Sequence, residues 1–242
     1  MTFTTDQNQT PPWGILATIA WLLLAFLISV VVAAGIYSAW QAGHPRPNTI
    51  TYDGVLIAIG SLASIPVQVA VLAFAAQLRR WPPMGYLALN MPRRGEIIFA
   101  AICVIALDVV FNALLYITGH DIVSPFQIEA YRTAQDAGWL LWLMIAIVVV
   151  APVGEEIAFR GFLYRGLALP GREIYAIVAI AIAWALLHIQ YDWPGMVQIF
   201  AIGLMFGWFR WASGSTTLTI VMHVLVNLEA MIETAIKVEV LS

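Results

Sequence analysis

The sequence has 242 residues, of which 62% are hydrophobic and 10% are charged, and its formal net charge is -3 at pH 7. Soluble domains carry about 25% charged residues, so this composition excludes an ordinary soluble protein and predicts an integral, multi-pass membrane protein surrounded by lipid. No basic stripe is present that could bind nucleic acid, so we expect no nucleic-acid partner. Cys103 is the only cysteine, which excludes an intramolecular disulfide.

Apolar runs of about 20 residues predict membrane-spanning helices. The sequence contains about seven such runs, separated by short linkers with proline and glycine, and we therefore expect an all-α, polytopic transmembrane helix bundle. The expected spans are roughly 13–41, 53–78, 96–118, 139–165, 173–191, 194–211 and 216–236. We divide the chain into a polar N-terminal tail (1–12), a part with the first three helices and their loops (13–138) and a part with helices four to seven (139–242). The first run is too long for a cleaved signal peptide, so we expect it to be a retained span.

Basic residues in the short loops predict the orientation of the bundle. If the N-terminus is cytoplasmic, the inner side collects more basic residues than the outer side. The inner residues are Arg79, Arg80, Arg93, Arg94, Arg165, Arg172 and Arg210, and the outer ones are Arg46, Arg132 and Lys237. We therefore expect a cytoplasmic N-terminus, an external C-terminus and a location in the plasma (inner) membrane of a bacterium.

Two pairs of residues within the spans are interpreted as structural. Asp108 and Asn112 are four residues apart in the third span, so they share one helix face. They could belong to a proton or ion path, but such residues more often form a hydrogen bond with a neighbouring helix. Gly203 and Gly207 in the sixth span form a small-xxx-small pair, which predicts close packing of two helices.

The fourth span contains two adjacent acids and an arginine, in the sequence GEEIAFR. A charge at the membrane centre costs roughly 2.5 to 3.5 kcal/mol on insertion scales, so acids in an apolar run indicate a functional site. Glu156 and Arg160 can pair on one helix face, whereas Glu155 points about 100° away. Glu155 would then be available as a general base. The alternative is that the ion pair only neutralises a helix end.

The fifth and seventh spans add polar residues that could complete such a site. His188 follows Trp184 by one turn, and His223 and Asn227 are four residues apart on one helix face. Singly, each is more often an interhelical hydrogen-bonding residue. Together with Glu155 they predict a hydrolytic site, in which the carboxylate activates water while His223 and Asn227 stabilise the oxyanion. Water must reach this site, so a gap between helices four, five and seven is expected.

These sequences resemble a known family. EEIAFR, WALLH and HVLVN are similar, in this order, to the EExxxR, FxxxH and HxxxN motifs of the CAAX-protease and bacteriocin-processing (CPBP, or Abi) family of intramembrane proteases, which includes the Ras-converting type of CAAX endopeptidase. The resemblance covers about residues 139–236, so the part 139–242 would be the catalytic core. Trp184 stands where the family pattern has phenylalanine, a replacement expected to change aromatic size but no chemistry.

The resemblance implies a role for each matching residue. Glu155 and His188 would activate the attacking water, Glu156 and Arg160 would form a supporting ion pair, and His223 and Asn227 would stabilise the oxyanion. Members of the family have been described both with and without a metal. Zinc could be held by Glu155, His188 and His223, but the sequence lacks HExxH, so we expect a glutamate mechanism without a metal or other cofactor.

The expected function is therefore an intramembrane endopeptidase that is open to the cytosol. The resemblance implies a prenylated protein tail or a peptide precursor as substrate, and the sequence selects neither of them, nor an oligomeric state. Two alternatives remain open: a non-proteolytic immunity or scaffold protein, and a small transporter built on Asp108, Asn112 and the glutamate pair. One conflict remains, because at about 1.5 Å per residue His188 would lie about 20 Å from the inner face, and Glu155 and His223 about 10 to 15 Å from it.

Overall fold

The computed structural model describes residues 13–44 and 51–241, so the predicted tail 1–12 and Arg46 lie outside the described residues. The described residues contain helices and no strand, which confirms the all-α class. Their bounds are α1 Ile15–Gly43, α2 Gly54–Leu78, α3 Pro83–Tyr86, α4 Arg94–Thr118, α5 Pro125–Asp136, α6 Leu140–Ile145, the π-helical segment η1 Ala146–Val150, α7 Ala151–Glu156, the π-helical segment η2 Ile157–Leu163, α8 Tyr164–Leu167, α9 Glu173–Leu186, α10 Trp193–Ser213 and α11 Thr216–Glu239.

Six stretches among the described residues are long and apolar enough to cross a membrane. They are α1, α2, α4, the continuous stretch Leu140–Leu167 from α6 to α8, α10 and α11. The fifth predicted span corresponds to α9, which has 14 residues. Such a helix rises about 21 Å, whereas the hydrocarbon core is about 30 Å thick. The estimate of about seven spans thus corresponds to six full-length spans and one short apolar helix.

The fifth predicted span ends at Leu186 instead of residue 191 because a helix start follows closely. Asp192 caps α10, and its carboxylate accepts a 3.1 Å hydrogen bond from the backbone N–H of Gly195. Pro194 lies in the first turn of α10, where its missing N–H is tolerated. The residues between Leu186 and Asp192 therefore form a turn, which hydropathy alone does not reveal because Leu187 and Ile189 are apolar.

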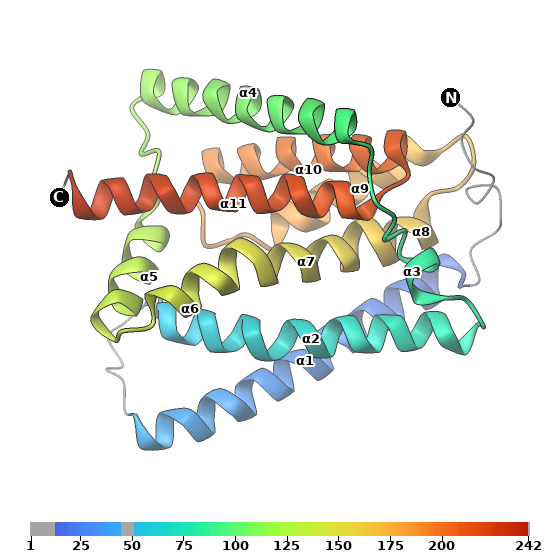
Figure 1. Ribbon diagram of the computed structural model, residues 1–242, viewed down its shortest axis with the longest axis horizontal. Helices are drawn as coiled ribbons and strands as arrows, with labels where there is room; N and C mark the ends of the chain where they lie inside the picture. Colours follow the sequence, from blue (N-terminus) through green and yellow to red (C-terminus); the bar gives the residue numbers. More distant parts are fainter. Residues whose placement is uncertain (1–12, 45–50, 242) are drawn as a thin grey trace.

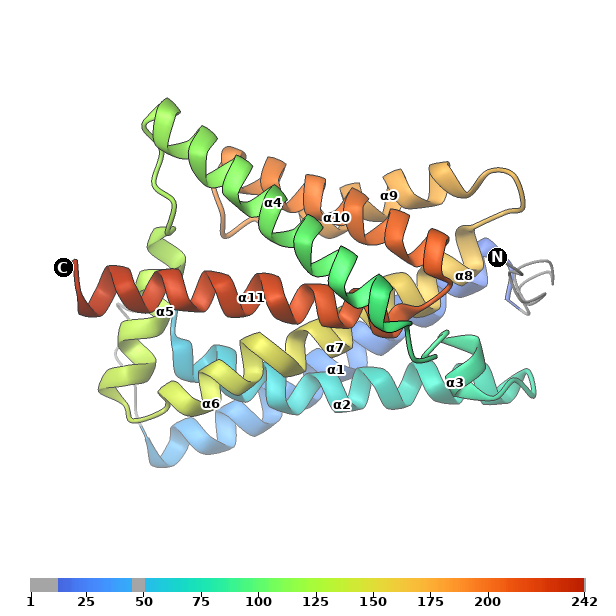
Figure 2. The ribbon, with the colours of Figure 1, turned by 45° about the horizontal axis from the view of Figure 1, so that its top comes forward.

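The helices form one bundle around α11 (Figures 1 and 2). α11 contacts α7, α10 and α4 along its length, and α5 lies across one end of the bundle against α2 and α11. α1 packs on α2, and α9 packs on α10. α2 and the helices of the C-terminal part thus surround the polar stretch around Glu155.

The outer faces of the bundle are apolar. Leu16 on α1 is 83% exposed and Ile117 on α4 is 78% exposed, and both lie among many exposed leucine, isoleucine and valine side chains. A soluble monomer does not present apolar surface on this scale. These faces are therefore the surfaces that contact lipid.

Glycine residues allow close helix packing beside the acids. A Cβ on Gly207 would lie 2.6 Å from Cγ2 of Ile177, and one on Gly154 would lie 2.5 Å from Cγ2 of Ile65. The predicted pair Gly203 and Gly207 is therefore the surface where α10 packs on α9. Gly154 similarly brings α2 against the stretch that carries the acids.

Most described arginines lie at one end of the bundle, where α2 ends and α4 begins. This end carries Arg79, Arg80, Arg93, Arg94, Arg165, Arg172 and Arg210, and the opposite end carries Arg132 and Lys237. The unequal distribution is the one expected from the sequence. That the arginine-rich end faces the cytosol stays a prediction.

Candidate functional site

Glu156 and Arg160 form the expected ion pair inside the bundle. Arg160 Nη1 donates to Oε1 of Glu156 over 3.0 Å, and the two side chains are 1% and 0% exposed. The Nη2 of Arg160 also donates to the backbone carbonyl of Gly203 over 3.3 Å. The bond to Gly203 joins the fourth span to α10.

The two acids, Glu155 and Glu156, lie between the π-helical segments η1 and η2. π-Helical turns occur often at functional sites.

His223 is hydrogen-bonded to the same carboxylate. Its Nδ1 lies 3.0 Å from Oε1 of Glu156. An ionised carboxylate only accepts, so Nδ1 carries the proton. The Nε2 atom has no hydrogen-bond partner among the described residues, and it can donate to an oxyanion only in the imidazolium form. The structure thus connects His223 to the ion pair, a contact that the sequence did not predict.

Asn227 faces the fourth span as His223 does, but it bonds to the backbone. Its Nδ2 donates to the carbonyl of Ile147 over 2.8 Å, within η1. A π-helical segment interrupts the usual bonding pattern of an α-helix, and the amide of Asn227 supplies a donor there. The side-chain NH₂ has two donors, so one N–H remains for a substrate. Its predicted role at the oxyanion stays a prediction.

Glu155 points away from the ion pair, as the helix geometry predicted. It is partly exposed, and its Oε2 accepts a 2.6 Å hydrogen bond from the indole Nε1–H of Trp184. Its Oε1 has no hydrogen-bond partner among the described residues. Of the two acids, Glu156 is buried and its Oε1 is shared by Arg160 and His223, whereas its Oε2 is buried without a hydrogen-bond partner among the described residues. Glu155 is partly exposed and keeps a carboxylate oxygen for another molecule.

His188 lies in the turn after α9 and not within a helix. Its Nδ1 is 2.8 Å from the backbone carbonyl of Trp184, and its ring centroid is 5.0 Å from the indole. A carbonyl only accepts, so Nδ1 carries the proton and Nε2 of the neutral ring is an acceptor. Trp184 therefore contacts both groups that were predicted to activate water.

The helix bounds in the structure remove most of the expected difference in depth between His188 and Glu155. The fourth span continues to Leu167, so Glu155 lies about 18 Å from that end at 1.5 Å per residue. His188 lies about 22 Å from the start of α9 by the same count. These depths agree within one helical turn, and Trp184 joins the two residues directly.

Aromatic rings enclose the polar groups. The ring of Trp184 lies 5.3 Å from that of His223 and 5.9 Å from that of Phe206, and Phe206 lies 5.5 Å from His223. The guanidinium of Arg160 lies 4.7 Å from the Trp184 ring and 5.3 Å from the Phe206 ring. Such contacts stabilise a desolvated cation. No motif indicated Phe206, which is one of many aromatic residues in apolar runs.

Tyr191 is a further residue near Glu155 that the sequence did not indicate. It lies in the turn between α9 and α10. Its ring centroid lies 6.4 Å from that of His188, so it stands on the side of the turn that faces the site. The phenol of Tyr191 can act there as a neutral hydrogen-bonding group.

The described residues do not form a metal site. No group of three or more histidine, cysteine, aspartate or glutamate side chains among them is arranged to hold a metal ion. Glu155 and His188 meet at Trp184, whereas His223 is bound to Glu156. The arrangement does not fit the zinc site considered for Glu155, His188 and His223, so the mechanism proposed below contains no metal-dependent step.

A second polar cluster joins α4 to α11. Asn112 Nδ2 donates to Asp108 over 2.8 Å and to Glu233 of α11 over 2.7 Å. The interhelical contact that we expected of Asn112 is therefore present. Its acceptor Glu233 and the neighbouring Glu229 lie four residues apart within the seventh predicted span. This spacing places both acids on one helix face, so the sequence already indicated a polar face there.

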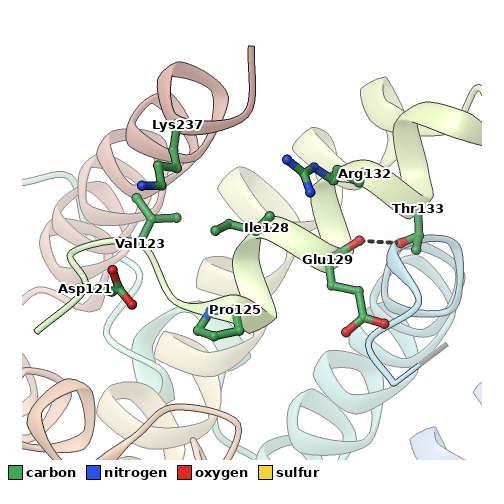
Figure 3. Close-up of a pocket in the computed structure, with 8 residues that line it drawn as sticks. All are labelled: Asp121, Val123, Pro125, Ile128, Glu129, Arg132, Thr133 and Lys237. Atoms are coloured by element: carbon green, nitrogen blue, oxygen red, sulfur yellow. Dashed lines mark hydrogen bonds between the residues drawn. The ribbon is translucent and has the colours of Figure 1, made fainter. Parts of the chain in front are cut away.

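A surface pocket of about 470 Å³ lies at the end of the bundle opposite the arginine-rich end (Figure 3). Its residues come from α5, the segment before it and the end of α11. They are Asp121, Val123, Pro125, Ile128, Glu129, Arg132, Thr133 and Lys237. None of the predicted site residues lines this pocket, so it is separate from the site at Glu155.

Fold and site together define a multi-pass membrane protein with a glutamate and histidine site enclosed by its C-terminal helices. Residues 137–228 match the family model described as type II CAAX prenyl endopeptidase, Rce1-like. The match confirms the resemblance found in the three motifs, and it includes all six predicted site residues. The description of that family names an endopeptidase that acts on prenylated CAAX proteins. No curated protein and no solved structure matches the chain.

Proposed function

We propose that this protein is an intramembrane endopeptidase that hydrolyses a peptide bond with water activated by Glu155 and His188. The proposal rests chiefly on one observation: Glu155 keeps a carboxylate oxygen outside any ion pair, beside a Glu156 that is bound to Arg160 and His223, inside the segment that matches the family. A partly buried carboxylate that forms no ion pair can accept a proton from water.

In the proposed reaction, a water molecule donates its two protons in hydrogen bonds to Oε1 of Glu155 and Nε2 of His188. Glu155 takes one proton as the water oxygen attacks the carbonyl carbon of the substrate. The oxyanion of the tetrahedral intermediate receives hydrogen bonds from Asn227 and from His223 in its imidazolium form. The amine leaves after it takes the proton from Glu155, which restores the carboxylate.

The proposed substrate is a prenylated protein tail or a membrane-associated peptide precursor that enters from the cytosolic side. The arginine-rich end of the bundle supports this orientation through the positive-inside rule. A prenyl group adds apolar surface that partitions into lipid, so it would hold the peptide at the membrane beside the site.

The test is cleavage of a fluorogenic prenylated tail peptide and of a panel of leader peptides by detergent-purified protein. The variants are Glu155→Gln and His188→Ala, and the matched controls are Asp136→Asn and His44→Ala, which lie at the bundle surface. Loss of a general base lowers rates by about 10²- to 10⁴-fold. We expect such losses in both site variants and full activity in both controls.

Each reaction is repeated with a chelator and with added zinc. Cleavage that is unaffected by the chelator agrees with the glutamate mechanism, and a loss that zinc reverses would replace it with a metal mechanism. Full cleavage by Glu155→Gln would overturn the proposal. A different result would identify a non-proteolytic immunity or scaffold protein. In that case the wild type cleaves no peptide but protects its host cell against a toxin, and this protection survives alanine at Glu155 or His188.

A further inference from the structure

We infer that Trp184 is a positioning residue that orients Glu155 and His188 toward one water molecule; this inference deepens the proposed function and rests on it. The indole N–H of Trp184 holds Oε2 of Glu155 at 2.6 Å, and its backbone carbonyl holds Nδ1 of His188 at 2.8 Å. A single residue thus contacts both groups, one through its side chain and the other through its main chain.

These two hydrogen bonds determine which atoms remain for the substrate water. With Oε2 occupied, Glu155 presents Oε1; with Nδ1 protonated and occupied, neutral His188 presents Nε2 as an acceptor. The two remaining atoms are both acceptors, and a water molecule has two protons to donate. A water bound in this way directs its lone pairs away from both residues, toward an attacked carbonyl carbon.

The packing around Trp184 fixes the direction of its N–H. The side chain is 3% exposed and lies between the guanidinium of Arg160, the ring of Phe206 and the ring of His223. A Cβ on Gly203 would lie 3.2 Å from Cε3 of Trp184, so the backbone of α10 closes the remaining side. A buried indole N–H needs an acceptor, and here that acceptor is Glu155.

The expectation that Trp184 differs from the family pattern in size alone is therefore wrong. Phenylalanine has no N–H, so a chain with phenylalanine at this position cannot form the bond to Glu155. The variant Trp184→Phe restores the family pattern and keeps an aromatic ring in the same packing. It removes the hydrogen bond and leaves the backbone carbonyl that binds His188, and so it separates positioning from packing.

The kinetic test compares the wild type, Trp184→Phe and the control Trp208→Phe, which changes an exposed residue of α10. A hydrogen bond to a charged group corresponds to about a 10- to 100-fold change in rate. We expect kcat of Trp184→Phe to fall by that factor, KM to change less than about twofold and Trp208→Phe to match the wild type. An unchanged kcat, or a raised KM at an unchanged kcat, would overturn the inference.

A spectroscopic test does not depend on cleavage. Protein labelled with ¹⁵N-tryptophan has ten indole N–H groups, and Trp184→Phe identifies the resonance of Trp184 by its disappearance. We expect this resonance at the downfield end of the proton spectrum and expect it to move upfield in Glu155→Ala. If the Trp184 resonance does not move in Glu155→Ala, the inference is wrong. If it moves but the protein cleaves no peptide, the hydrogen bond between Trp184 and Glu155 is present and the proposed protease function is wrong.

Discussion

Arg210 donates a 2.9 Å hydrogen bond from its Nε to the backbone carbonyl of Arg160. Both guanidinium groups are almost fully buried, and the donated bond joins the last turn of α10 to the η2 segment. The carbonyl lies in a π-helical stretch, where the backbone bonding of an α-helix is interrupted. Arg210 therefore stabilises the turn that holds Arg160 beside Glu156, through a bond to the main chain of Arg160.

Replacement of Arg210 by methionine should destabilise the protein. Methionine has a similar length but no donor, so the buried carbonyl of Arg160 loses its partner, which costs about 1 to 3 kcal/mol. Unfolding by SDS titration measures this loss. The control Arg172→Met changes an exposed arginine and should leave the unfolding free energy unchanged; equal effects of the two variants would contradict the role given to Arg210.

Replacing Glu156 by glutamine should lower the stability of the protein, whereas replacing Glu155 by glutamine should lower its cleavage rate. Glu156 is shared by Arg160 and His223, so Glu156→Gln leaves a buried cation without its counter-ion and should cost about 3 to 5 kcal/mol of stability. Glu155→Gln should abolish cleavage and change stability by less than about 1 kcal/mol. The double variant Glu156→Gln with Arg160→Met removes the unpaired charge and should recover part of the loss. Equal stability of the two single variants would show that the ion pair is not the structural partner of the site.

Phenylalanine at Tyr86 should stabilise the protein at neutral pH. The Tyr86 side chain is 0% exposed, and its hydroxyl has no hydrogen-bond partner among the described residues. A buried unsatisfied hydroxyl costs about 1 to 3 kcal/mol, and phenylalanine keeps the ring contacts with Trp81 and Phe162. The midpoint of SDS unfolding should therefore rise, and a fall of the midpoint would mean that the hydroxyl has a partner such as water.

The same residue should contribute to alkaline unfolding. Burial raises the pKa of Tyr86 from 10.0 to about 12, and the positive charge of Arg165 opposes this in part. A raised pKa means that the folded state binds the proton of Tyr86 more tightly than the unfolded state does. The contribution of this proton to the free energy of unfolding is therefore complete below about pH 10 and is lost as the pH rises toward 12. Stability measured across this range should fall less steeply in Tyr86→Phe than in the wild type. Identical slopes would contradict the prediction.

Leucine at Asn112 should weaken the contact between α4 and α11 without affecting cleavage. It removes the hydrogen bonds to Asp108 and Glu233, which should lower stability by about 1 to 2 kcal/mol. The cleavage rate should stay within about twofold of the wild type, because none of the site residues contacts this cluster. Ala113→Leu, at an exposed neighbouring position, is the control. Loss of proton or ion transport in Asn112→Leu would instead favour the transporter alternative.

Much of the fold and several contacts of the site could be predicted from the sequence. Apolar length identified the membrane spans, and the spacing of Glu156 and Arg160 predicted their ion pair because a helix brings residues four apart together. The three motifs indicated the family. These features depend on composition, local geometry or a linear pattern, all of which a single chain contains.

The remaining features depend on tertiary contacts. The π-helical segments have no sequence signature, so the interaction of Asn227 with the Ile147 carbonyl could not be anticipated. Hydropathy treats the turn at His188 as part of a span, because it counts apolar residues and ignores the capping of α10 by Asp192. The bond from Trp184 to Glu155 joins two helices and becomes visible only when both are placed.

The turn from Leu187 to Asp192 has a consequence for the surrounding bilayer. α9 ends about 9 Å before a full hydrocarbon thickness is crossed, so irregular backbone continues at a depth where lipid offers it no hydrogen bonds. Such backbone is stable at that depth only beside protein or a hydrated cavity. Leu187 and Ile189 are exposed on the outside of the turn, and His188 lies against Trp184 on its inside. We therefore expect a local channel of solvent along the inner side of this turn, so that acyl-chain length in the host membrane sets how readily the reactant water reaches Glu155.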